Sequence, residues 1–160
     1  MTFNATDTAM ATTHTWLTPK HIIDALGPFD LDPCAAPEPR PFPTAAHMNS
    51  IHAGGVDGLS LDWFGRVWLN PPYSDKPIQW LHKLKQHGNG IALIFARTDT
   101  QWFQAIAADH GVYFMRGRVS FLKSDGSKTN PAGAPSVLIP FGKENVDKIL
   151  NSNIEGVWKP

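Results

Sequence analysis

The residues of this sequence best suited to chemistry are four consecutive ones: Asn70, Pro71, Pro72 and Tyr73. The prolines fix the backbone and remove N–H donors, so the carbonyl oxygen of Pro71 can act as a pure acceptor. The side-chain oxygen of Asn70 is a second acceptor, and Tyr73 offers a flat face for stacking. Together these groups match an exocyclic amino group, with its two N–H donors, on a planar ring. A strand-ending turn with a capping tyrosine is the alternative explanation.

Several other segments accompany this turn along the chain. They are Trp16-Leu17-Thr18-Pro19, the run from Phe29 to Ala35 (FDLDPCA), Asp57-Gly58-Leu59 with Trp63, Arg97-Thr98-Asp99-Thr100, Gly117-Arg118-Val119-Ser120-Phe121 and Ala134-Pro135-Ser136. With Asn70-Pro71-Pro72-Tyr73 they resemble the small phage-type DNA N6-adenine methyltransferases, which depend on S-adenosylmethionine. The resemblance extends over about residues 16–142.

The resemblance implies a role for each of these segments. It implies that the cofactor-binding residues are Thr18 and Pro19 beside the methionine part, Asp32, Pro33, Cys34 and Ala35 in the first cofactor motif, and Asp57 and Leu59 near the cofactor adenine. The catalytic residues would be Asn70, Pro71, Pro72 and Tyr73. The sequence departs from the family at Cys34-Ala35-Ala36-Pro37, where the usual glycine pair is absent.

The implied reaction is site-specific methylation of adenine in DNA. Accepting both N–H bonds of the N6 amino group favours a tetrahedral nitrogen, and these bonds strengthen as charge develops in the transition state. The methyl donor must lie in line with the nitrogen, and the target base must rotate out of the duplex. The reaction requires no metal and no covalent intermediate.

Other acceptors suit the same turn. N4 of cytosine, adenine in RNA and a protein glutamine amide also present an NH2 on a planar group. A catalytically silent nucleic-acid-binding module is the alternative from another class. A P-loop enzyme is disfavoured because the sequence holds no G-x-x-x-x-G-K-[ST] loop.

The elements expected around these residues alternate between strands and helices. Thr18-Pro19 predicts a helix start with Thr18 as N-cap, and the apolar pattern predicts helices over 77–87, 101–110 and 146–150 and strands over 29–32, 67–69, 91–95, 112–114, 119–121 and 136–141. This pattern predicts an α/β protein. With the resemblance, it indicates a Rossmann-like S-adenosylmethionine-dependent methyltransferase sandwich, with a mostly parallel sheet and an antiparallel hairpin at its edge.

Length and composition set the outer limits of this interpretation. The chain has 160 residues, of which 42% are hydrophobic, enough for one domain; we expect a mobile arm over residues 1–13 and one catalytic domain over 14–160. The lone cysteine excludes an intramolecular disulfide, and no apolar run approaches ~18 residues. No His-x-x-x-His or Cys-x-x-Cys pattern indicates a metal. We therefore expect a cytoplasmic protein without membrane or metal, in the host cytoplasm if the gene belongs to a phage.

Charge is distributed unevenly along the chain. Residues 1–75 hold three Lys or Arg and eight Asp or Glu, whereas residues 76–160 hold eleven and six. The resemblance implies DNA as the partner, and we expect the basic half to supply the residues that contact it: Arg97, Arg116, Arg118, Lys123 and Lys128. An ordinary solvated hairpin is the alternative for this region.

Overall fold

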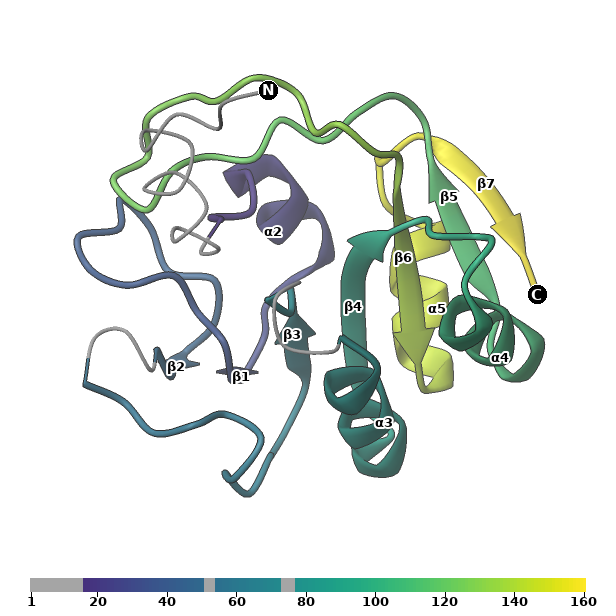
Figure 1. Cartoon of the computed structure of the whole chain (residues 1–160), viewed down its shortest axis with the longest axis horizontal. Coiled ribbons are helices and arrows are strands. Elements are labelled where there is room, and N and C mark those ends of the chain that lie inside the picture. The colour runs from purple at the N-terminus through teal and green to yellow at the C-terminus, as the bar shows by residue number, and fades with distance from the viewer. Residues whose placement is uncertain (1–15, 51–53, 73–76) are drawn as a thin grey trace, which may run out of the picture.

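The computed structural model describes residues 16–50, 54–72 and 77–160 (Figure 1). The helices are α2 (Lys20–Leu26), α3 (Pro77–His87), α4 (Gln101–Asp109) and α5 (Lys143–Leu150). The strands are β1 (Leu31–Asp32), β2 (His47–Met48), β3 (Val67–Leu69), β4 (Gly90–Phe95), β5 (Val112–Met115), β6 (Ser136–Phe141) and β7 (Gly156–Lys159). The α/β class predicted from the alternating pattern is confirmed.

The strands of the described residues form one seven-stranded sheet in the order β2-β1-β3-β4-β6-β5-β7. The pairs β1–β2, β1–β3 and β3–β4 are parallel, and the pairs β4–β6, β5–β6 and β5–β7 are antiparallel. The sheet is therefore mixed rather than mostly parallel. The predicted hairpin of β5 and β6 does form, but it is not at the edge, because β6 lies against β4 and β7 covers the outer side of β5.

Helices cover both faces of this sheet (Figure 1). On one face, α3 and α4 bury Leu81, Leu84 and Phe103 against the sheet, and on the other α2 and α5 bury Ile22 and Ile149. Strand β3 contributes to both cores, because side chains alternate across a strand: Val67 and Leu69 join the first core and Trp68 the second. Burial on both faces explains why this strand is a continuous apolar run.

The connection between β5 and β6 is a long strap, which we define as residues 116–135. The predicted strand over 119–121 is wrong: Val119 and Phe121 are buried in the core beneath α2 without strand pairing, and Leu122 bridges to Leu17 and Lys128. Figure 1 shows the strap, in green, crossing from β5 past α2 toward the connection between β1 and β2. The strap is therefore held in place mainly by its contacts with the rest of the chain, and less by pairing between its own residues.

Helix α2 begins one residue later than the sequence predicts. Its N-cap is Pro19, with no side-chain capping bond, so Thr18 is not the N-cap. By contrast, the predicted bounds of α3 are confirmed, and Gly88 ends it with φ +79°. Among the described residues, no helix has the length and apolar character to cross a membrane.

Candidate functional site

The parallel pairing of β1 and β3 brings two of the predicted motifs together. Both strands run in the same direction, so Asp32 at the end of β1 and Asn70 after the end of β3 lie at the same edge of the sheet. The Sγ of Cys34, two residues after β1, donates a hydrogen bond of 3.2 Å to the backbone oxygen of Asn70. This bond ties the first-motif loop, residues 32–35, to the start of the predicted catalytic turn at Asn70.

The Asn70 side chain is held through its nitrogen. Its Nδ2 donates to the backbone oxygen of Trp16 at 3.3 Å and to Oγ1 of Thr18 at 3.4 Å. From the described residues, neither Oδ1 of Asn70 nor the carbonyl oxygen of Pro71 accepts a hydrogen bond. Within the described ranges these two oxygens therefore have no donor, and their role as acceptors for an amino group stays a prediction.

Two further residues of the predicted catalytic turn, Pro71 and Pro72, lie within the described part of the chain. Pro71 is buried and Pro72 is half-buried. Tyr73 lies outside the described residues, so its predicted stacking role stays a prediction.

Asp32 is a buried carboxylate whose partners lie in its own loop and in the following segment. It is 3% exposed, and it accepts hydrogen bonds from the Cys34 nitrogen at 3.1 Å and from Oγ1 of Thr44 at 2.5 Å. Burial raises the pKa of Asp32 to about 6, although both hydrogen bonds and the nearby positive charge of Arg40 act in the opposite direction. The interactions of Thr44 and Arg40 with Asp32 were not predicted from the sequence, because nothing in the Pro-rich stretch indicates which polar side chains point inward.

Cys34 is suited to donating a hydrogen bond rather than to nucleophilic attack. Burial, followed by the charge of Asp32, raises the pKa of the Cys34 thiol well above its usual value. The group therefore stays a neutral thiol at neutral pH, and a thiol is a poor nucleophile.

The segment of Asp57, Gly58 and Leu59 packs against the first-motif loop. Asn49 connects the two, since its Nδ2 donates to the backbone oxygen of Pro33 at 3.1 Å and to that of Val56 at 2.7 Å. The carboxylate of Asp57 accepts from the Leu59 nitrogen at 3.0 Å and so shapes its own turn. Asn49 was not predicted, because its role depends on a contact across the sheet edge.

Pro19 and Ala35, the remaining predicted cofactor residues, are buried at the same edge. Pro19 directly follows Thr18, and Ala35 is 4% exposed, with its nitrogen donating to the Asn49 oxygen at 2.9 Å. The structure thus brings every described residue predicted for cofactor binding to the ends of β1, β2 and β3.

The residues predicted to contact DNA are all exposed, but they are not equivalent. Arg97 follows β4, with its guanidinium 5.7 Å from the centre of the Phe95 ring. Arg116 pairs with Glu155 at 3.0 Å. The charged side chains of Arg118, Lys123 and Lys128 form no ion pair with the described residues. They lie on the strap.

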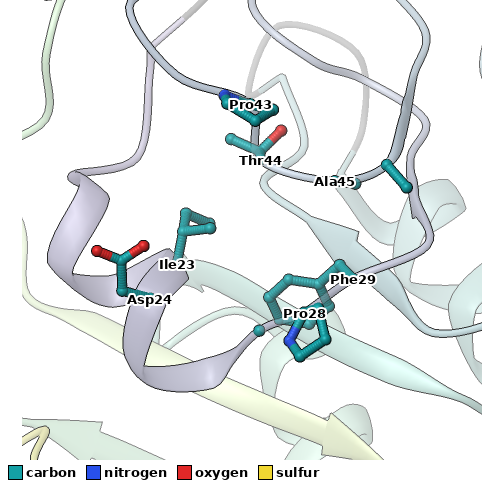
Figure 2. A pocket seen from close by; sticks show the side chains of 9 residues that line it. Ile23, Asp24, Pro28, Phe29, Pro43, Thr44 and Ala45 are labelled. Carbon is teal, nitrogen blue, oxygen red and sulfur yellow. The ribbon is translucent and has the colours of Figure 1, made fainter.

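A cleft of about 420 Å³ is lined by residues of α2 and of the two segments 27–29 and 43–46 (Figure 2). Ile23 and Asp24 of α2 line it, with residues 27–29 and 43–46. Thr44 is the link to the site, because its hydroxyl bonds Asp32 while its residue lines the cleft. None of the residues predicted from sequence to bind cofactor or DNA lines this cleft.

In the described ranges, no three or more His, Cys, Asp or Glu side chains are placed together so that they could bind a metal ion.

Comparison with known proteins was made for the whole chain. No curated protein and no solved structure gives a significant match. A sequence model of the family described as DNA N-6-adenine-methyltransferase (Dam) matches residues 5–153, which is most of the chain. This match shows that the chain belongs to the Dam family of DNA N6-adenine methyltransferases.

Proposed function

We propose that this chain transfers the methyl group of S-adenosylmethionine to N6 of adenine at specific sites in DNA, with Asn70 and Pro71 as the acceptors that hold the target amino group. Family membership supports the reaction class. The observation that supports the assignment of residues is the Asn70 carboxamide, whose nitrogen is bonded while its oxygen has no donor among the described residues. The backbone oxygen of Asn70 accepts from Cys34 of the first-motif loop.

The residues at this edge of the sheet fit the proposed cofactor. S-Adenosylmethionine carries an amino group, a carboxylate, ribose hydroxyls and an adenine ring, and when bound it supplies a sulfonium methyl as the electrophile. Asp32 places a carboxylate, 3% exposed, at the same end of the parallel strands as Asn70. Each oxygen of Asp32 accepts one bond from the protein and keeps a second lone pair for a donor. Asp57 and Leu59 would flank the adenine.

The chain's own contribution to the reaction is to hold and polarise the amino group. The lone pair of N6 is delocalised into the ring, so the free amine is a weak nucleophile. Oδ1 of Asn70 and the carbonyl of Pro71 accept its two N–H bonds and favour a tetrahedral nitrogen. S-Adenosylmethionine, when bound, would supply the methyl for the new N–C bond, its sulfur would keep the electron pair of the S–C bond, and the nitrogen would release one proton to solvent. The acceptor bonds strengthen as positive charge develops, so they stabilise the transition state more than the ground state.

We further propose that the fold is a Rossmann-like methyltransferase sandwich. The parallel part of the sheet, β2-β1-β3-β4, places the candidate site beyond the carboxyl ends of its strands, which is where open α/β sheets bind ligands. Helices on both faces complete the layers.

Base rotation and phosphate contact complete the proposal. An amino group inside a duplex is inaccessible to a protein acceptor pair, so the adenine must leave the stack. Tyr73 would stack on the extruded ring. Arg97 and the strap residues Arg118, Lys123 and Lys128 would contact phosphates, with a smaller part for Arg116, whose charge is already paired.

The test uses Asn70→Ala with an asparagine control elsewhere. We expect the methylation rate to fall at least ~100-fold, as on loss of a hydrogen-bonding group that stabilises developing charge, while calorimetry shows cofactor affinity within about twofold of wild type. Asn153→Ala removes an exposed asparagine and should retain full activity.

Product analysis decides the acceptor. With methyl-labelled cofactor and separate DNA, RNA and protein substrates, digestion should yield labelled N6-methyladenine from DNA. Full activity in Asn70→Ala, or label found in N4-methylcytosine, in RNA adenine or in protein glutamine in its place, would overturn the proposal.

A further inference from the structure

A carboxamide at Asn70 can present either its oxygen or its NH2 group to the acceptor site, and only the oxygen suits an amino substrate. We propose that Thr18, acting with the backbone oxygen of Trp16, is a positioning residue that fixes Asn70 with Oδ1 toward the substrate. This inference rests on the proposed function, because it assigns the orientation of the group that does the chemistry.

The contacts of Asn70 with Trp16 and with Thr18 contribute differently to the orientation of the carboxamide. The Trp16 carbonyl is an obligate acceptor, so the group 3.3 Å away must be the NH2 of Asn70. A hydroxyl can donate or accept; that of Thr18 accepts the second N–H at 3.4 Å. Both N–H bonds of Nδ2 are then satisfied within the protein, and Oδ1 is left facing away from them.

The reversed orientation is disfavoured at both ends. It would place Oδ1 of Asn70 against the Trp16 oxygen, which is a repulsive contact between two acceptors. It would also direct an NH2 group at a substrate amino group, which has N–H bonds of its own. A preorganised oxygen avoids the cost of turning the side chain during each reaction cycle.

The segment that carries these two acceptors is itself fixed. Leu17, between them, exchanges two backbone hydrogen bonds of 2.9 Å with Leu122 of the strap. Leu17 and Thr18 are each 1% exposed. The acceptors therefore stand on a rigid backbone, which is what a positioning role requires.

The Thr18 hydroxyl has no competing structural task in the described chain. Helix α2 uses Pro19 as its N-cap and makes no side-chain capping bond, so Thr18 does not stabilise the helix end. Its contact with Asn70 is the hydrogen bond that the structure gives this side chain.

The decisive experiment compares Thr18→Val with Thr18→Ser. Valine keeps the shape and removes the hydroxyl, whereas serine keeps the hydroxyl. We expect Thr18→Val to lower kcat about tenfold at saturating S-adenosylmethionine with the cofactor Kd unchanged, and Thr18→Ser to recover kcat to within about threefold of wild type. A raised KM for the cofactor with kcat unchanged would overturn the inference, because it would make Thr18 a cofactor ligand only.

A second readout does not depend on activity. The Asn70 side-chain NH2 signals are identified in a ¹⁵N NMR spectrum by their absence from Asn70→Ala. We expect one of the two protons to shift upfield in Thr18→Val and to return in Thr18→Ser; signals that stay unchanged in Thr18→Val would refute the contact.

The same variants separate the two proposals. An Asn70→Ala protein that methylates normally would remove the proposed function, and the positioning role with it. An inactive Asn70→Ala together with full kcat in Thr18→Val would remove only the role of Thr18.

Discussion

Asp32 shows how burial sets the chemistry of one residue at the candidate site. Its carboxyl is 3% exposed, and loss of hydration raises its pKa from 3.8 to about 6 despite the bonds from Thr44 and Cys34. At neutral pH the group is therefore ionised at a cost to the fold. A ligand that brings a positive charge or N–H donors to this edge would offset part of that cost.

Replacing Asp32 with asparagine tests this cost through the pH dependence of stability. The folded state holds its proton up to about pH 6 and the unfolded state only to about pH 4, so the free energy of unfolding falls as pH rises through this window. Urea unfolding at pH 5 and pH 8 should show wild type losing about 1–2 kcal/mol more than Asp32→Asn over that interval. Equal losses in the two proteins would contradict the raised pKa.

At the scale of elements, the site depends on close packing between segments that have no regular structure. Gly58 lies so near the first-motif loop that an added Cβ would come within 2.1 Å of the Pro33 oxygen and 2.8 Å of Cη2 of Trp80 on α3. Trp63 donates from Nε1 to the Gly58 oxygen at 2.9 Å and stacks on Trp80. The packing of Trp63 on Trp80, and the lack of a side chain at Gly58, thus allow the segment of Asp57 and Leu59 to lie close against the loop.

Gly58→Ala should therefore open this contact. Backbone oxygen cannot yield as a flexible side chain does, so we expect a loss of about 1–3 kcal/mol in the free energy of unfolding and at least ~10-fold weaker binding of S-adenosylmethionine. Thermal unfolding and calorimetry measure the two effects. Gly133→Ala is the matched control, because an added Cβ there meets nothing within 4 Å. Unchanged cofactor affinity in Gly58→Ala would separate this segment from the cofactor site.

At the scale of the whole molecule, the strap joins parts of the chain that are far apart in sequence. Leu122 pairs with Leu17, and Gly126 approaches Pro41, where an added Cβ would lie 2.7 Å from the ring. Figure 1 shows that the strap runs from β5, past α2, toward the end of the strand order that holds β1 and β2. A surface that carries Arg118, Lys123 and Lys128 is thus held beside the segment that contacts Asn70.

The salt dependence of DNA binding tests whether this surface meets phosphates. Each of Arg118→Ala, Lys123→Ala and Lys128→Ala should weaken binding and reduce the slope of log K against log salt by about one. Arg116→Ala should have a smaller effect, because Glu155 already neutralises that charge. Lys159→Ala is the control, since Lys159 is exposed and pairs with Val112 at the start of β5, the end of that strand opposite to the one from which the strap leaves. An unaltered slope in all three strap variants would exclude the strap as the DNA surface.

Local patterns were sufficient for the elements whose signals lie within a few residues of each other. The spacing of Ile78, Leu81 and Leu84 predicts α3 because one apolar face suffices to define a helix, and Gly88 marks its end. The prediction of an acceptor pair at Asn70 and Pro71 likewise rests on local signals, because the prolines restrict the backbone wherever the turn is placed. These features depend on covalent geometry and on immediate neighbours.

Only the tertiary structure decided what those local features meet. Strand β7 and the internal position of the hairpin follow from pairing with β5 and β4, for which no local signal exists. The sequence predicts Thr18 as a helix cap and as a cofactor-binding residue, yet its hydroxyl accepts a hydrogen bond from Asn70, 52 positions away, and the helix cap is Pro19. The raised pKa of Asp32 also arises from burial by segments distant in sequence. Hydrogen-bond partners and desolvation are properties of the packed chain, so the sequence indicates which residue types suit the chemistry, whereas their orientation and environment come from the tertiary structure.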